Sequence, residues 1–130
     1  MRYLIDSNWV IDCLCVSSRH LRRVAELERD GVALSVIALA ELRVGVHRVS
    51  DPVLAAQRMN AYISRFSLLP VDSETSEMFG REKARLLQQG NVIEDFDLML
   101  AATAMRHDLT LLSDNRRHFE RIAGLRIESV

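Results

Sequence analysis

The chain has 130 residues, of which 48% are hydrophobic, and its formal net charge is −1. A chain of this length can bury a substantial core without disulfides or a structural metal, so we expect residues 1–130 to form a single domain. The near-neutral charge lacks the overall basic character by which many nucleic-acid-binding domains are recognised.

Cysteine content and hydropathy indicate the compartment. Cys13 and Cys15 are too close together for an unstrained bridge, and two cysteines cannot form a zinc quartet. We therefore expect reduced thiols, as in a reducing cytoplasm. The N-terminus meets charge at once and no uncharged apolar run reaches about 18 residues, so neither a signal peptide nor a membrane span is expected. The prediction is a cytoplasmic protein.

Short apolar runs alternate with helical patterns along the chain. Strands are expected at residues 2–5, 32–35, 67–71, 109–113 and 126–128. Helices are expected at residues 7–30, 36–49, 52–66, 73–89, 95–107 and 116–122. Ser35 is expected to cap the second helix, Asp72 or Ser73 the fourth, and Pro70 indicates a strand end or a sheet edge. This alternation predicts an α/β fold of three layers, with a short parallel sheet of about five strands flanked by helices.

Four acidic residues occupy positions of interest in this pattern. Asp6 and Asp114 each end a strand, Asp97 lies at the front of an apolar helix, and Glu41 interrupts the apolar run at residues 36–42. Ligand sites in open parallel sheets lie beyond the carboxyl ends of the strands, so these carboxylates are expected to converge at one edge. Like charges held together need cations, which predicts a metal site.

Each acid also has a structural alternative. Asp6 is a favourable helix cap, and Glu41 on its apolar helix is compatible with either a functional role or a buried ion pair with Arg48. Asp114 with Asn115 is typical of a turn after a strand. Their joint placement at one edge favours the functional interpretation.

The acids at residues 94–97 are expected to have different roles. A helix needs one cap, and negative charge is favoured at a helix N-terminus. We expect Asp95 to be the cap and Asp97, which is already inside the helix, to belong to the site.

Other catalytic chemistries lack the required spacing. The histidines are scattered without a metal-binding pair, and neither a G-x-S-x-G elbow nor a glycine-rich phosphate loop is present. The four histidines, which are expected at the surface, are His20, His47, His107 and His118.

Several short motifs together resemble those of a known family. They are Leu-Ile-Asp-Ser-Asn at 4–8, Ala-Glu-Leu-Arg-Val-Gly at 40–45, Asp-Phe-Asp-Leu-Met-Leu-Ala-Ala at 95–102, Leu-Ser-Asp-Asn at 112–115 and Phe-Glu-Arg-Ile at 119–122, followed by Gly-Leu at 124–125. In this order and spacing, the chain resembles the PIN-domain family over essentially its whole length. Within that family it is similar to VapC-type toxins of bacterial type II toxin–antitoxin pairs.

The resemblance implies specific metal-binding positions. In such proteins the acids that match Asp6, Glu41 and Asp97 bind the divalent metal, and the residue matching Ser7 helps to hold the site. The resemblance therefore implies that the three acids carry over directly as metal ligands, with Ser7 as a supporting residue.

A fourth position is left open by the resemblance. The family's pattern of Ser or Thr, a variable residue, then Asn or Asp matches Ser113 and Asn115, which leaves Asp114 as the variable residue. Many relatives carry an acid where this chain has His118. A fourth catalytic acid would be Asp114, or Asn115 would act through a water.

The implied activity is metal-dependent hydrolysis of RNA that leaves a 5′-phosphate. Hard oxygen ligands favour Mg²⁺ or Mn²⁺ over zinc. The implied partners are RNA, a VapB-like antitoxin through which the protein reaches DNA indirectly, and a second copy in a homodimer. Basic residues considered for contact with the RNA backbone are Arg43, Arg48, Arg116, Arg117 and Arg121.

Two alternatives are retained. A weakly active or inactive binding module would act mainly in the antitoxin–DNA complex. A solitary RNA-processing PIN nuclease would lack a neighbouring antitoxin gene.

Overall fold

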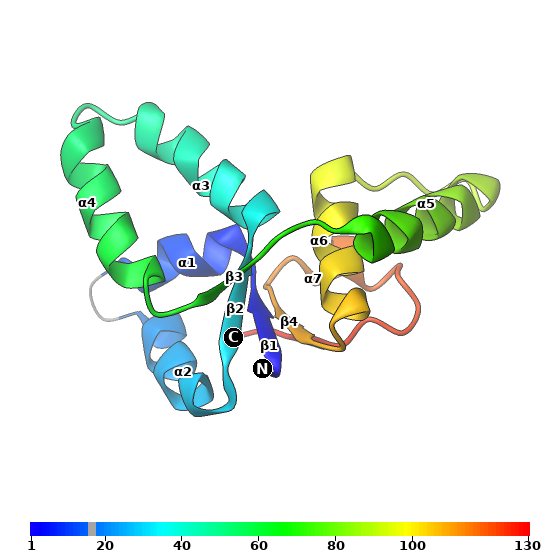
Figure 1. The fold of residues 1–130 in the computed structure, drawn as a ribbon, viewed down its shortest axis with the longest axis horizontal. Helices are drawn as coiled ribbons and strands as arrows, with labels where there is room; N and C mark the ends of the chain where they lie inside the picture. The colour runs from blue at the N-terminus through cyan, green and yellow to red at the C-terminus, as the bar shows by residue number, and fades with distance from the viewer. Residues whose placement is uncertain (16–17) are drawn as a thin grey trace.

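A five-stranded parallel sheet forms the centre of the molecule in the computed structural model, which describes residues 1–15 and 18–130 (Figure 1). The strands are β1 (Tyr3–Ile5), β2 (Val32–Ser35), β3 (Ser67–Leu69), β4 (Thr110–Leu112) and β5 (Ile127–Glu128), in the order β3-β2-β1-β4-β5. Leu4 pairs with Ala33 on one side and with Leu111 on the other. The predicted parallel α/β fold is confirmed.

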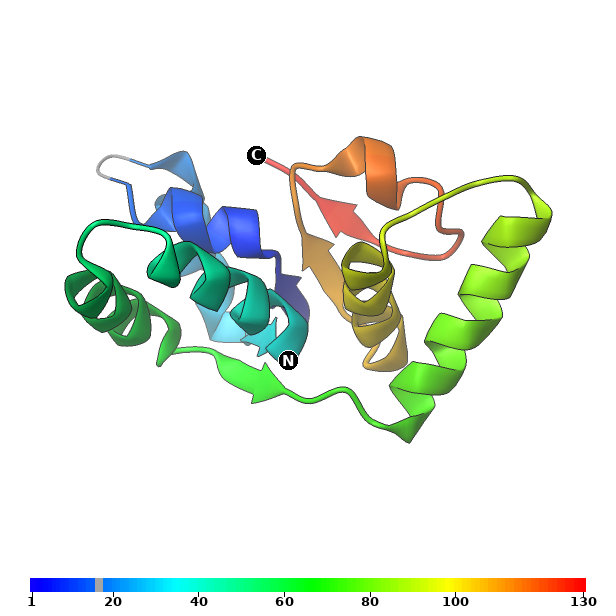
Figure 2. The same ribbon diagram turned by 90° about the horizontal axis from the view of Figure 1, so that it is seen from above.

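Seven α-helices and one 3₁₀ turn connect the strands in the described residues. They are α1 (Ser7–Cys13), α2 (Arg19–Leu27), the 3₁₀ turn η1 (Glu28–Asp30), α3 (Val36–His47), α4 (Pro52–Ile63), α5 (Ser73–Gln88), α6 (Asp95–Arg106) and α7 (Arg116–Phe119). Figures 1 and 2 show α1 to α4 on one side of the sheet and α5 to α7 on the other. None of the helices in this described part is long and apolar enough to cross a membrane.

The first helical region differs from the prediction. The single helix expected at residues 7–30 is instead α1, α2 and the 3₁₀ turn. The hydroxyl of Ser18 accepts a hydrogen bond from the amide of Leu21 and so begins α2 as a new helix. Residues 16–17 of the predicted helix lie outside the described residues.

The other element boundaries follow local capping. Ser35 accepts a hydrogen bond from the amide of Ile37 at the start of α3, and Asp72 accepts one from the amide of Thr75 at the start of α5. Pro70 directly follows β3, which is an edge strand, as predicted. The predicted helix ends at 66 and 122 lie three residues beyond the observed ends of α4 and α7.

The core lies around the central strands. Leu4, Ile5, Leu111 and Leu112 of β1 and β4 are fully buried, because helices cover both faces of these strands. Along the chain, β2 and β3 lie to one side of β1, whereas β4 and β5 lie to the other. The sheet therefore changes its winding direction between β1 and β4, which is where open α/β sheets place their ligand sites.

Candidate metal centre

Asp6 lies at this switch point, directly after β1. It is 6% exposed, and its carboxylate makes no capping bond to α1 although it stands at the N-cap position. Instead its Oδ2 accepts a hydrogen bond of 2.8 Å from the hydroxyl of Ser113, and its Oδ1 lies 3.4 Å from the hydroxyl of Ser7. Ser113, which follows β4, and Ser7, the first residue of α1, thus hold the carboxylate in place without neutralising it.

Glu41 faces Asp6 from α3. The hydroxyl oxygen of Ser7 lies 3.4 Å from Oε1 of Glu41 as well as from Asp6, and its single proton serves one carboxylate at a time. In the described residues no basic group forms an ion pair with Glu41, and Arg48, considered as its partner, is exposed at the end of α3. The buried ion pair considered for Glu41 is therefore not formed.

Asp97 approaches from the first turn of α6. Its Oδ2 lies 3.1 Å from Nδ1 of His118, and its side chain is 20% exposed. The neighbouring acids differ from the prediction, because Glu94 is the N-cap residue, without a side-chain capping bond, and Asp95 pairs with Lys83 at 2.5 Å. Asp95 is therefore the first residue of α6, and its carboxylate pairs with a lysine of α5 instead of capping the helix.

Electrostatic repulsion links the three acids. Burial raises the pKa of Asp6 above its ordinary value of 3.8, and the charge of Asp97 adds to that effect against the hydrogen bonds from Ser113 and Ser7. Burial also raises the pKa of Glu41 above 4.5, followed by the charges of Asp6 and Asp97. Glu94 contributes to the same repulsion. Among the described residues Asp6 and Glu41 have no basic partner, and Asp97 contacts only His118 in this way. The three carboxylates therefore suit a hard divalent ion.

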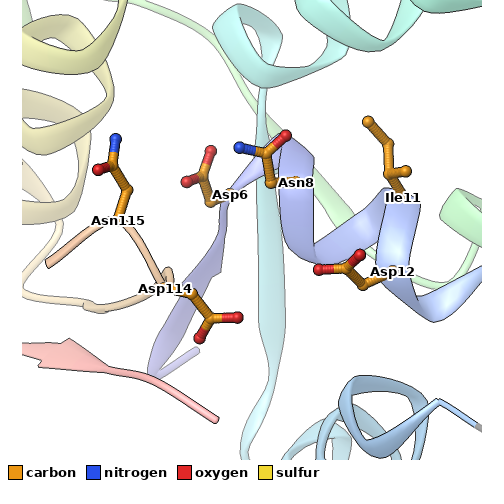
Figure 3. A pocket seen from close by; sticks show the side chains of 6 residues that line it. All are labelled: Asp6, Asn8, Ile11, Asp12, Asp114 and Asn115. Carbon is orange, nitrogen blue, oxygen red and sulfur yellow. The ribbon is translucent and has the colours of Figure 1, made fainter.

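A cavity of about 410 Å³ opens beside Asp6 (Figure 3). Its lining is polar apart from one isoleucine: Asp6, Asn8, Ile11, Asp12, Asp114 and Asn115. In Figure 3 the carboxylate of Asp114 points away from the amide of Asn115, whereas Asp6 lies between Asn115 and Asn8.

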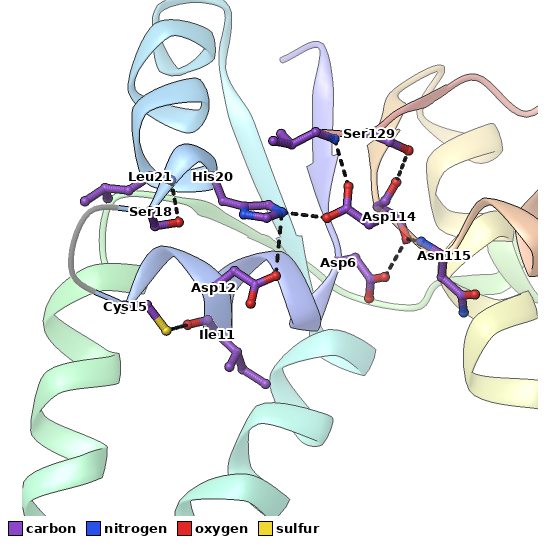
Figure 4. A network of polar contacts seen from close by, with 12 residues as sticks. Asp6, Ile11, Asp12, Cys15, Ser18, His20, Leu21, Asp114, Asn115 and Ser129 are labelled. Atoms are coloured by element: carbon purple, nitrogen blue, oxygen red, sulfur yellow. Dashed lines mark hydrogen bonds and ion pairs between the residues drawn. The ribbon is translucent and has the colours of Figure 1, made fainter.

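Asp114 already has its own partners. Its Oδ2 lies 2.5 Å from Nε2 of His20, and its Oδ1 accepts a hydrogen bond of 2.8 Å from the amide of Val130 (Figure 4). Burial alone would raise the pKa of Asp114, but the hydrogen bonds from His20 and Val130 bring it below 3.8. These contacts give Asp114 a structural role at the end of β4, and its catalytic role stays a prediction.

His20 also approaches Asp12, whose Oδ2 lies 3.6 Å from the same nitrogen. Among residues 1–15 and 18–130, Asp12, His20 and Asp114 are the one group of three whose ligand atoms all lie within 4.8 Å of one another. The acids at positions 6, 41 and 97 do not converge so closely. However, Nε2 of His20 already lies between the other two carboxylates, at hydrogen-bond distance from Asp114 and at 3.6 Å from Asp12.

Ser113 and Asn115 are both tied to the candidate centre. Besides donating to Asp6, the hydroxyl of Ser113 accepts a hydrogen bond of 3.1 Å from the amide of Asn115. The side-chain nitrogen of Asn115 lies 3.0 Å from Nδ1 of His118. These contacts link the end of β4 to Asp6 and, through His118, to Asp97.

The arginines considered for RNA contact differ in availability. Arg43 donates to Asn60, Arg121 donates to the carbonyl of Val92, and Arg116 pairs with Glu120 and contacts Ser129. Arg48 and Arg117 are exposed, and neither forms an ion pair or side-chain hydrogen bond with another described residue.

Sequence reasoning missed four participants around the centre. His20 and His118 were expected only as surface residues but contact carboxylates, and Asp12 and Glu94 were given no role. For His118 a signal was present, since it occupies the position before Phe119 where an acid was expected. Asp12 and His20 meet only through the packing of α1 and α2, which no local pattern reveals.

Comparison with known proteins identifies the family. The PIN-domain family model matches residues 3–125. A ribonuclease VapC2 of Haemophilus influenzae is 30% identical, covering 99% of this chain and 98% of that protein. The chain belongs to the PIN-domain family, among the VapC ribonucleases. A tRNA(fMet)-specific endonuclease VapC of Salmonella typhimurium is 29% identical over 98% of this chain and 97% of its own length.

Solved structures show the same relationship for this PIN-domain protein. The DNA-bound VapBC complex of Salmonella typhimurium contains a chain with a TM-score of 0.92 and 29% identity, covering 99% of this chain and 98% of that one. A chain of VapBC2 from Rickettsia felis, bound to a promoter DNA fragment, has a TM-score of 0.93 at 24% identity. The match covers 100% of this chain and 99% of that one. The PIN-like fold predicted from the sequence is thereby confirmed.

Proposed function

We propose that this protein is a metal-dependent endoribonuclease that acts as the toxin of a toxin–antitoxin pair. The observation that carries the proposal is the meeting of Asp6, Glu41 and Asp97 at the switch point of the sheet with raised pKa values for Asp6 and Glu41. The similarity to VapC ribonucleases over nearly the full length of both chains supports an RNA substrate.

The proposed cation is Mg²⁺ or Mn²⁺, held by the carboxylates of Asp6, Glu41 and Asp97. These ligands are hard oxygens, and Mg²⁺ binds few carboxylates while keeping several waters and substrate phosphate oxygens. When bound, such an ion lowers the pKa of water and stabilises negative charge on phosphate oxygens. A histidine base is therefore not required for the proposed hydrolysis.

The protein's own residues prepare the centre for this chemistry. Ser113 and Ser7 orient the carboxylate of Asp6, and Asn115 lines the cavity beside it. Arg117, exposed near the same strand end, is proposed to contact the RNA backbone. The expected products carry a 5′-phosphate.

The proposed protein partner is a DNA-binding, VapB-like antitoxin. Support comes from the solved VapBC complexes of Salmonella typhimurium and Rickettsia felis, both of which are bound to DNA. In this proposal the toxin reaches DNA only through the antitoxin, and it forms a homodimer. A short neighbouring gene for such a protein is the expected genomic context.

Sequencing RNA 5′ ends in cells tests activity and substrate together. Wild-type protein is expected to create new 5′-phosphate ends that are absent when Asp97→Asn is expressed at the same level. Initiator tRNA is the first RNA to inspect, because the Salmonella relative is a tRNA(fMet)-specific endonuclease. Identical end profiles for the two proteins would contradict the proposed activity.

A further inference from the structure

His118 is the one histidine of the described residues that contacts an acid of the candidate metal centre. It lies on α7, and its Nδ1 is 3.1 Å from Oδ2 of Asp97 and 3.0 Å from Nδ2 of Asn115. The imidazole is 41% exposed, whereas the Asp97 side chain is 20% exposed. The contact therefore joins a partly open ring to a more enclosed carboxylate.

The two neighbours of Nδ1 of His118 determine whether this nitrogen donates or accepts a hydrogen bond. A nitrogen of imidazole either donates or accepts, so Nδ1 cannot accept from the Asn115 amide and also donate to Asp97. Without a proton, its lone pair would face the negative oxygen of Asp97 at 3.1 Å. With a proton, Nδ1 donates to Asp97.

The Asn115 amide accommodates the same solution. A half-turn of the side-chain amide exchanges the places of its oxygen and its nitrogen. After that turn, Oδ1 of Asn115 replaces Nδ2 beside Nδ1 of His118. Both neighbours of the Nδ1 proton are then acceptors.

We propose that His118 is a positioning residue for Asp97, on the basis of the proposed metal-dependent function. Its Nδ1–H donates to Oδ2 of Asp97 and so fixes the carboxylate, while Oδ1 stays free of that hydrogen bond and available to the divalent cation. Hydrogen-bonded partners of metal ligands typically change metal affinity by about 10- to 100-fold when they are removed. His118 thus acts on cation binding through Asp97.

Two substitutions separate positioning from other roles. His118→Ala removes the donor, whereas His118→Asn retains an N–H close to the place of Nδ1. Asp97→Asn removes the proposed ligand itself, and His47→Ala is a matched control because His47 is an exposed histidine elsewhere on α3.

The experiment is calorimetric titration of each purified protein with Mn²⁺ in the absence of RNA. His118→Ala is expected to raise the Kd for Mn²⁺ about 10-fold or more, while His118→Asn and His47→Ala stay within about threefold of wild type. The melting temperature without metal should be nearly the same for His118→Ala and wild type, which excludes general destabilisation.

Three outcomes would overturn the inference. An unchanged Kd for His118→Ala, beside a lost Mn²⁺ signal for Asp97→Asn, would contradict positioning by His118 while leaving the proposed function intact. Equal losses for His118→Ala and His118→Asn would make the imidazole itself, and not its Nδ1 donor, the requirement. A wild-type protein that binds no Mn²⁺ would contradict the metal centre and therefore both proposals.

Discussion

Two acidic groups lie at the same edge of the sheet, yet they are electrostatically opposite. Asp6 and Glu41 have no cationic partner in the described residues and their pKa values are raised. Asp114 is held by His20 and the amide of Val130, and its pKa is lowered. Closeness of carboxylates is therefore a poor sign of a functional site. Carboxylates left unbalanced in a buried position are a better one.

The largest expected difference between the two groups is in RNA cleavage. Asp6→Asn should reduce the cleavage rate by at least about 100-fold, because it removes a proposed ligand of the ion that stabilises the transition state. Asp114→Asn should stay within about threefold of wild type. Single-turnover cleavage of RNA in Mg²⁺ measures both, and a comparable loss in the two variants would restore Asp114 as a fourth catalytic acid.

The next difference is in stability, and its sign reverses between the groups. Asp6→Asn should raise the melting temperature of the metal-free protein by a few degrees, since the buried charge and its repulsion are removed. Asp114→Asn should lower the free energy of unfolding by about 1 kcal/mol, because charge-assisted hydrogen bonds at a partly exposed site are lost. Thermal unfolding of both variants measures these effects, and shifts of the same sign would remove the distinction.

The raised pKa values of Asp6 and Glu41 also predict how stability depends on pH. A carboxyl with a raised pKa in the folded state favours folding when protonated, so its contribution is present below the unfolded pKa and is lost as pH rises through the folded one. For Asp6 and Glu41 this loss begins near their ordinary values of 3.8 and 4.5 and continues upward.

Denaturant unfolding of the wild type and of the double variant Asp6→Asn/Glu41→Gln isolates this contribution. Without metal, the double variant should gain stability relative to wild type as pH rises from about 4 toward neutrality. Saturating Mg²⁺ should stabilise the wild type selectively and reduce that difference. A pH-independent difference without metal would show that the two carboxyls do not have raised pKa values.

The smallest expected effect concerns RNA binding at the rim of the centre. Arg117→Gln should weaken RNA binding by a few-fold, since it removes one phosphate contact. The slope of log K against log salt concentration should become shallower by about one. Arg116→Gln should have less effect on the salt slope, because Arg116 is already paired with Glu120. Filter binding at several salt concentrations distinguishes them, and equal slopes for both variants would contradict the assignment to Arg117.

Much of the fold was predictable because its signals are local. The buried strand at residues 32–35, the caps at Ser35 and Asp72, and the edge position indicated by Pro70 each depend on a few neighbouring residues. The order of alternating strands and helices then gives a parallel sheet. The break between α1 and α2 escaped prediction because the capping role of Ser18 is weak in sequence and clear only in the folded chain.

The candidate site was predictable only in part, for a related reason. Asp6 and Asp97 could be placed at strand and helix ends from local patterns, and Glu41 stood out as a charge in an apolar helix. Packing determines which residues an acid contacts. Lys83 of α5 pairs with Asp95, and His20 of α2 contacts Asp114. Sequence position could therefore identify candidate acids, but it could not show which of them have no basic partner in the folded chain.

Incubation of purified protein with RNA and Mg²⁺, beside Asp97→Asn and beside wild type with excess chelator, decides whether the protein is a metal-dependent ribonuclease. Wild type with Mg²⁺ is expected to produce fragments with 5′-phosphate ends, while the variant and the chelated sample leave the RNA intact. Equal cleavage in all three samples, or none in wild type with Mg²⁺ or Mn²⁺, would contradict a metal-dependent ribonuclease centred on Asp6, Glu41 and Asp97.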